Sequence, residues 1–170
     1  KYGFKFGFLG FAEKPWLDCL SPEIDVDKLT YIDYNESLRE HSKKLRDQGC
    51  DLVIALNHMR LPEDLCMAQE NDHTVVDIAF CGHDHGYHRS LNEKTSVFVQ
   101  KSGTDFECLT NLTVLFGVEK EDCEAYKTEF AAKAKEVEAK NKLVKPSEDI
   151  EFFYSAATKR MFISERVNIT

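Results

Sequence analysis

The sequence is poor in positive charge and in long apolar runs. Its 170 residues include 22 lysines and arginines but 30 aspartates and glutamates, which gives a net charge of −8. Proteins that bind DNA or RNA present a positive surface to the phosphate backbone, so this composition argues against a nucleic-acid polymer as partner. No apolar run approaches the roughly 20 residues that a membrane-spanning helix needs, and we expect no membrane span.

The cysteines lack the short spacing that is typical of zinc sites. The six are Cys19, Cys50, Cys66, Cys81, Cys108 and Cys123. Without a Cys-x-x-Cys pair or a regular framework, neither a structural zinc site nor a disulfide scaffold is indicated. We expect reduced thiols, with Cys50 and Cys81 acting as small core residues within or beside apolar strands.

The chain also lacks a starting methionine and a secretion signal. We favour a cytoplasmic location, but a secreted or an assembly-bound one stays open because a signal removed earlier would leave no trace. Asn-x-Ser/Thr triplets occur at Asn35, Asn111 and Asn168. Such triplets often arise by chance, and Asn111 falls within an expected strand. Glycosylation at Asn35 or Asn168 stays open.

The residues that are present indicate a globular α/β protein, with 42% hydrophobic and 11% aromatic residues. We expect strands at 1–11, 51–57, 75–81, 96–100, 108–118, 150–154 and 160–170, and helices at 36–48, 65–70 and 119–142. Asn35 is the expected N-cap of the first helix and Gly49 its stop. The strand–helix–strand order between residues 51 and 81 predicts parallel pairing with a right-handed crossover.

Two of the apolar runs stop at histidines. Residues 52–56 are followed by Asn57-His58, and the run that ends at Cys81 is followed by Gly82-His83-Asp84-His85. In open α/β sheets ligands bind beyond the carboxyl ends of the strands, and imidazole is a common ligand of transition metals. One His-x-His is weak evidence, but a second strand of the same design places three histidines at one sheet edge.

At these residues the sequence resembles the metallophosphoesterases, or calcineurin-like phosphoesterases, and within them the 5'-nucleotidase branch. The similarity lies in residues 45–60, in residues 76–85 and in the turn 101–106, and it covers most of 1–118. It implies the C-terminal half of an α/β/β/α sandwich, with mixed sheets and flanking helices. Residues 1–170 would then form a single partial domain, in which 119–148 is a charged helical insertion.

The resemblance also implies a centre of two divalent metal ions that hydrolyses phosphate esters, with Mn, Fe, Zn and Mg all open. By motif, His58 and His83 would bind one metal and His85 the other. Two such ions activate water and hold the phosphoryl oxygens. Arg60 is expected either to contact a substrate phosphate or to form a surface ion pair. Asp84 would either orient an imidazole or, as we favour, cap its own turn.

Three N-terminal motifs of the family are absent: Asp-x-His, Gly-Asp-x-x-Asp and Gly-Asn-His-Asp/Glu do not occur in the chain. The expected partner is therefore a chain or fragment that carries the N-terminal half, and the expected substrate is a nucleotide or another phosphate ester. Half a sandwich would expose a sheet edge and an apolar face. The alternative function is a non-catalytic structural or interaction subunit of a larger assembly that docks through helix 119–142.

Three further side chains lie outside these motifs. Trp16 could stack on a nucleobase, although ordinary packing is favoured, and His41 and His73 are expected to face solvent.

Overall fold

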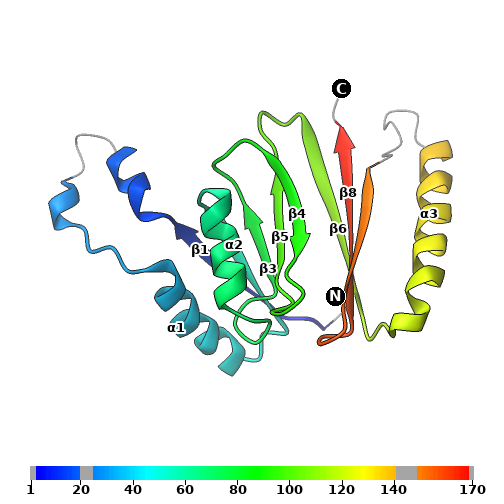
Figure 1. Ribbon diagram of the computed structural model, residues 1–170, viewed down its shortest axis with the longest axis horizontal. Coiled ribbons are helices and arrows are strands. Elements are labelled where there is room, and N and C mark those ends of the chain that lie inside the picture. The colour runs from blue at the N-terminus through cyan, green and yellow to red at the C-terminus, as the bar shows by residue number, and fades with distance from the viewer. Residues whose placement is uncertain (1–2, 20–24, 141–148, 169–170) are drawn as a thin grey trace. The chain divides into compact units, whose positions relative to one another are not determined.

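The computed structural model describes residues 3–19, 25–140 and 149–168 (Figure 1). The chain divides into two compact units, the first made of Lys1–Asp84 with Asn92–Lys101 and the second of His85–Leu91 with Ser102–Thr170. Each unit combines strands with flanking helices, so the expected α/β class is confirmed. The single partial domain over 1–170 stays a prediction, and the units are described separately. Within the described ranges, no helix has the length and apolar character of a bilayer-crossing segment.

The first unit is built on parallel strands. Their order across the sheet is β1 (Phe6–Ala12), β2 (Leu52–His58), β3 (Ile78–Cys81) and β5 (Phe98–Ser102). The register pairs Asn57 with Cys81 and Cys81 with Lys101. The expected parallel pairing around residues 51–81 is confirmed, and these strands reach their carboxyl ends at one edge of the sheet.

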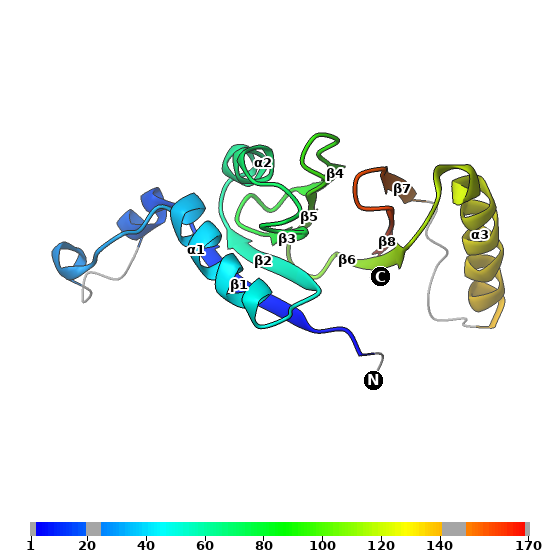
Figure 2. The same cartoon turned by 90° about the horizontal axis from the view of Figure 1, so that it is seen from below.

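Two helices, α1 (Tyr34–Asp47) and α2 (Leu61–Glu70), cover one face of this sheet. The core between them and the strands includes Tyr34, Leu38, Ala55, Met59, Met67, Ala68, Val76, Ala79, Val97 and Val99. Figure 2 shows α1 running along β1 and β2. The apolar side chains of the two helices thus pack against every second side chain along the strands.

The opposite face of β1 is apolar and open. The register places Phe6, Phe8 and Leu56 on this face, and they are 50%, 57% and 47% exposed. Within the described residues no strand pairs with the outer edge of β1. Grouped large apolar side chains at a surface usually mark an interaction site. These exposed apolar side chains lie beside the free edge of β1, while Leu52 and Ile54 on the same face of β2 are buried, and the half-sandwich stays a prediction.

The N-cap expected at Asn35 is wrong. Asp33 caps α1, because its Oδ1 accepts the backbone N–H groups of Asn35 and Glu36 at 2.9 and 3.2 Å. Asn35 is buried, and its amide nitrogen donates to a carboxylate oxygen of Glu70 at 3.0 Å. A glycan on that nitrogen would have to separate α1 from α2, so this arrangement excludes glycosylation at Asn35 in the folded chain. The expected stop at Gly49 is confirmed by its φ of 81° beyond the end of α1.

Several other boundaries differ from those expected, and strand β1, for example, starts at Phe6 and not at residue 1. The second helix begins at Leu61 and not at residue 65, because Pro62 is well suited to a first helical turn. Strand β3 starts at Ile78 and not at 75, because the N–H groups of Val75 and Val76 donate to Asp72 in a turn. Strand β5 starts later than residue 96 because Ser96 has a φ of 62°.

Short helical turns and one strand were not expected. The segment expected as a loop, 12–28, contains 3-10 turns at Lys14–Cys19 and Val26–Lys28, with residues 20–24 outside the described ranges. Strand β4 (Tyr87–Leu91) follows the second histidine motif.

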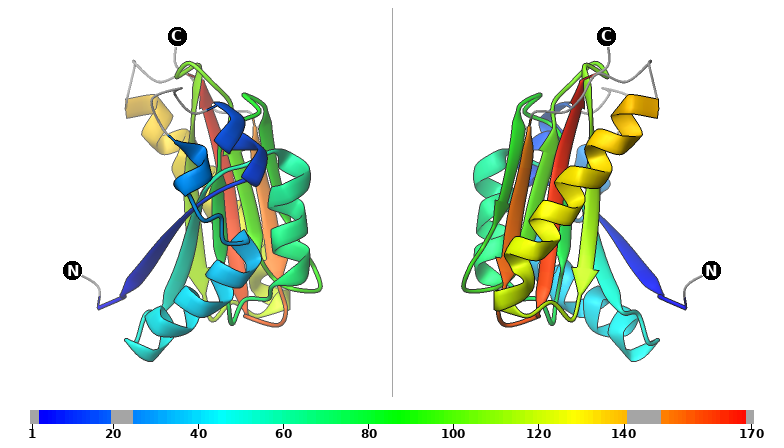
Figure 3. Two further views of the ribbon diagram at one scale, coloured as in Figure 1. Left: turned by 90° about the vertical axis from the view of Figure 1, so that its left-hand side faces the viewer. Right: turned by 90° about the vertical axis from the view of Figure 1, so that its right-hand side faces the viewer.

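The second unit is an antiparallel sheet covered by a helix. The strand order is β6 (Cys108–Phe116), β8 (Arg160–Asn168) and β7 (Ile150–Ser155). Helix α3 (Cys123–Lys140) crosses this sheet in the right-hand view of Figure 3. Phe130 packs edge-on against Phe152, with ring centroids 6.2 Å apart. The helix expected at 119–142 is confirmed over 123–140, while residues 141–148 of the expected insertion lie outside the described residues.

All six cysteines are free thiols, as expected. Cys50, Cys108 and Cys123 are buried, and Cys81 is partly buried at the end of β3.

Candidate functional site

Two of the three predicted metal ligands lie together at the carboxyl ends of neighbouring parallel strands. His58 is the last residue of β2, and His83 follows β3 after Gly82. Nδ1 of His83 is 3.1 Å from Nε2 of His58, and the rings meet edge to face with an interplanar angle of 79°. His83 has a φ of 77°, so the turn after β3 is tight. The structure thus brings the two imidazoles together, while their role as metal ligands stays a prediction.

His85 is the first residue of the second unit. It is exposed and has a φ of 58°. Its expected role as a ligand of the other metal stays a prediction. His88, which lies outside the motif, contacts the hydroxyl of Ser90 through Nε2 at 2.9 Å, and His41 is exposed on α1 as expected.

A buried carboxylate that sequence reasoning missed lies beside this histidine pair. Glu13 is only 3% exposed, and its Oε1 is 2.6 Å from Nη1 of Arg60 and 3.8 Å from Nε2 of His83. The backbone N–H of Arg60 donates to Oε2 at 3.0 Å. Of the two expectations for Arg60, the ion pair is the one that forms. Its side chain stays 54% exposed, so a phosphate could still reach the guanidinium.

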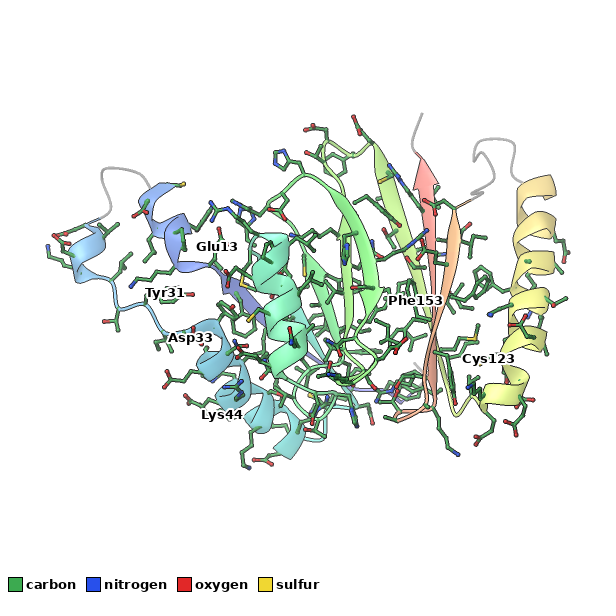
Figure 4. All side chains as sticks on the ribbon, in the orientation of Figure 1. Glu13, Tyr31, Asp33, Lys44, Cys123 and Phe153 are labelled. Carbon is green, nitrogen blue, oxygen red and sulfur yellow. The ribbon has the colours of Figure 1, made fainter. Side chains whose placement is uncertain are left out.

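The pair is bordered by Trp16 and by a pocket. Trp16 packs edge-on against His58, with centroids 5.2 Å apart, and is 37% exposed, so both expectations for this side chain stay open. A pocket of about 320 Å³ is lined by Glu13, Arg60, Tyr31 and Tyr34, among others. Figure 4 shows Glu13, Tyr31 and Asp33 on this side of the first unit. Burial and the nearby carboxylate of Glu63, to which the phenol donates, raise the pKa of Tyr34.

A second polar cluster lies beneath the histidine loops and is centred on a buried lysine. Lys101, at 2% exposure, places Nζ 2.8 Å from Oδ2 of Asp64 and 3.2 Å from Oδ2 of Asp84. The same nitrogen donates to the backbone carbonyl of Met59 at 2.8 Å and to that of Gly82. The two carbonyls belong to the residue after His58 and the residue before His83.

The charges in this cluster are set by burial and by Lys101. Burial raises the pKa of Asp64, and hydrogen bonds from Lys101 and Asn57 oppose this shift. Asn57 donates to Oδ1 of Asp64 at 2.9 Å. Burial also raises the pKa of the Cys81 thiol, and the charge of Asp64 adds to that effect, so this cysteine is a poor nucleophile.

Asp84 does not cap its own turn. Its Oδ2 accepts the backbone N–H of Leu61 at 2.6 Å, which ties the loop after β3 to the start of α2. Burial acts to raise the pKa of Asp84, but the hydrogen bonds from Leu61 and Lys101 outweigh it and lower the pKa. Asp84 is therefore a carboxylate at neutral pH.

The donors present fit part of a metal site but not a whole one. A catalytic zinc ion, for example, takes three protein ligands. Two imidazole nitrogens converge here, yet within the described parts of the chain no group of three or more His, Cys, Asp or Glu side chains has metal-binding geometry. His58 and His83 could supply at most two ligands of such an ion, and the metal centre stays a prediction.

The sequence analysis did not identify Glu13 or Asp64 as site residues, and it placed Lys101 only in the turn 101–106. A signal was available for Lys101, because it stands two residues after the apolar run Val97–Val99, near the carboxyl end of β5, much as Asn57 stands near the carboxyl end of β2. Glu13 follows β1 in the same way. A charged residue at the carboxyl end of a parallel strand is a candidate for the site edge.

No protein-family model matches this chain, and a search of curated proteins finds no match. The similarity to metallophosphoesterases therefore rests on the motif residues alone and stays a prediction.

Proposed function

We propose that this chain is the C-terminal part of the catalytic domain of a metal-dependent phosphohydrolase of the 5'-nucleotidase type. The observation that carries the proposal is the convergence of His58 and His83, whose ring nitrogens lie 3.1 Å apart at the ends of two parallel strands. An exposed guanidinium, that of Arg60, lies beside the pair. Imidazoles are common metal ligands and a guanidinium binds phosphate, so the two together suit the metal-dependent hydrolysis of a phosphate ester.

Each residue then has a defined task. His58 and His83 would hold one divalent ion through their ring nitrogens, and His85 would be a ligand of the second. When bound, such ions would lower the pKa of a water molecule and offset charge on the phosphoryl oxygens. Arg60 binds a phosphate oxygen with the N–H groups that do not face Glu13, since guanidinium has five donors. Glu13 keeps that guanidinium at the rim of the site.

The open face of β1 supports the second half of the proposal, which is that another segment completes the site. Phe6, Phe8 and Leu56 form an apolar surface beside a free strand edge. Covering such a surface with a second layer of structure would be favourable, at about 25 cal/mol for each Å² of apolar area removed from water. The partner is the N-terminal half that carries the family's remaining metal ligands.

The test is phosphate release from AMP and p-nitrophenyl phosphate by the protein purified at its natural length, with Mn²⁺ or Zn²⁺ added. We expect H58A and H83A each to lower kcat/KM by more than about 100-fold, because even residues that only support a ligand cost up to that much. The control is H41A, which changes an exposed histidine on α1 and should leave kcat/KM unchanged. Full activity in H83A would refute the proposal.

A second candidate is a non-catalytic subunit of a larger assembly. It is favoured by one observation: among the described residues, no group of three or more His, Cys, Asp or Glu side chains could hold a metal ion. Helix α3, the expected docking element, packs one side on its own sheet through Phe130. The ion pair of Glu129 and Lys133 borders this contact, because both residues line a pocket together with Phe130 and strand residues of the sheet. Natural-length protein that binds no metal and releases no phosphate, but co-purifies in a fixed stoichiometry with one partner, would support this candidate over the enzyme.

A further inference from the structure

Lys101 is the most deeply buried cation near the candidate site. Its side chain is 2% exposed and Asp64, its nearest carboxylate, is fully buried. Removing an ammonium group from water is costly, and a buried ion pair is often no more stabilising than apolar residues of the same volume. Stability alone is therefore a weak reason for a lysine at this position.

The directions of its contacts suggest another reason. An ammonium group has three N–H donors, and here it is surrounded by four acceptors. Two are the carbonyls of Met59 and Gly82, each of which adjoins a histidine of the pair. One charged group therefore links the loop after β2 to the loop after β3.

The two carboxylates extend this link to helix α2. Asp64 lies in the first turn of α2 and also accepts a hydrogen bond from Asn57, the residue before His58. Asp84 accepts the N–H of Leu61, the first residue of α2. Both histidine loops and the helix start are thus connected through Lys101, which lies on β5.

We infer that Lys101 is a positioning residue that holds the loops of His58 and His83 in the geometry needed to bind a metal ion. The inference rests on the proposed function and assigns a role to a residue that contacts neither imidazole nor substrate. Without the ammonium group, the two carbonyls and two carboxylates would repel one another. The loops would then separate, and the imidazoles with them.

The first measurement is Zn²⁺ binding to the protein of natural length by competition with a chromophoric chelator. K101M keeps the length of the side chain and removes its charge and its donors. We expect it to weaken binding by about 10- to 100-fold, the usual effect of removing a group that supports a metal ligand. Folded K101M that binds Zn²⁺ as tightly as the unchanged chain would overturn the inference.

The matched control is D77N, which disturbs another buried carboxylate of the same unit. Asp77 is paired with Arg46 at 2.6 Å and does not touch the histidine loops through that contact. A residue with a merely structural role would lower stability without changing affinity, and we expect this result for D77N. Equal loss of Zn²⁺ affinity in D77N and K101M would overturn the inference.

A second measurement separates failure of the inference from failure of the proposed function. If the unchanged protein of natural length shows no Zn²⁺ binding that depends on His58 and His83, the proposed function fails, and the role of Lys101 is judged by amide hydrogen exchange without metal. We expect K101M to raise exchange at least about tenfold at Leu61 and Asp84, relative to the amides of β2, because opening free energies differ between local segments. No selective increase at these amides would overturn the inference.

Should K101M fail to fold, D84N takes its place in both measurements. Asp84 is 28% exposed, so the substitution is tolerated more easily. It retains the lysine but weakens the link between the loop of His83 and the start of α2. We expect a smaller loss in the same direction, and an unchanged affinity together with unchanged exchange at Leu61 would count against the inference.

Discussion

Two glycines of β1 give opposite predictions for the same substitution. A Cβ added at Gly7 would lie 2.7 Å from Cδ1 and 3.2 Å from Cβ and Cγ of Leu45, which packs on this strand from α1. A Cβ added at Gly10 would meet nothing closer than the carbonyl oxygen of Leu56 at 3.9 Å. Both glycines lie in the same strand, so they differ mainly in this contact.

The magnitudes follow from two effects of opposite sign. Replacing glycine by alanine in a compatible conformation stabilises a protein by about 0.4–1 kcal/mol, because the unfolded chain loses freedom. Overpacking costs about 1–3 kcal/mol, and the partly exposed side chain of Leu45 can yield to some extent. We therefore expect G10A to raise the free energy of unfolding by about 0.5 kcal/mol. We expect G7A to lower it by about 0.5–2 kcal/mol.

The assay is urea unfolding, followed by the fluorescence of the single tryptophan, Trp16, which belongs to the same unit. The cost of G7A should shrink when Leu45 is also replaced by alanine, because contacting residues do not act additively. G7A and G10A of equal stability, or a cost of G7A that is the same with and without Leu45, would refute the packing of α1 on β1.

Two further predictions concern carboxylates. Asp77 is fully buried and accepts the backbone N–H of Val53 at 2.7 Å besides its pair with Arg46. D77A should therefore lower the free energy of unfolding in urea by about 3–5 kcal/mol. D47A, which removes the exposed partner of Lys43, should lower it by less than about 1 kcal/mol. Equal costs of the two variants would contradict the burial of Asp77. Hydrogen bonds from the side chain and backbone of Thr74 lower the pKa of Asp72, so its contribution to stability is present above the ordinary value of 3.8 and is lost as the pH falls below it. D72N should have a lower free energy of unfolding than the unchanged chain at pH 7 but not in acid. If the difference in free energy of unfolding did not change with pH, these hydrogen bonds would not act through the charge of Asp72.

The parallel sheet and the histidine pair could be predicted because they depend on local pattern. The apolar runs before His58 and His83 are long enough to identify strands. Helix α1, which precedes β2 in the sequence, has a recognisable stop at Gly49. Parallel strands end at the same edge, so the meeting of the two imidazoles follows from the strand assignment.

The boundaries could not be predicted because they depend on contacts distant in the sequence. Asp33 and Asn35 are both good N-caps, and their local surroundings do not distinguish them. The choice is made by Glu70, which takes the amide of Asn35 into the interface between α1 and α2. The same limit applies to β4, whose residues Tyr87–Leu91 are half-buried and lack the apolar run of the other strands.

The contacts of the nearby acidic residues explain why no third potential metal ligand joins the histidine pair among the residues that the structure describes. Each carboxylate close to it is already committed: Glu13 to Arg60, Asp64 to Lys101, and Asp84 to Lys101 and the N–H of Leu61. Turning the carboxylate of Asp64 towards a metal would leave the ammonium of Lys101 buried without its closest partner, and breaking a buried ion pair costs about 3–5 kcal/mol. A third ligand from another segment avoids that cost. We therefore expect the chain to bind metal weakly by itself, and much more tightly together with the half that covers the open face of β1.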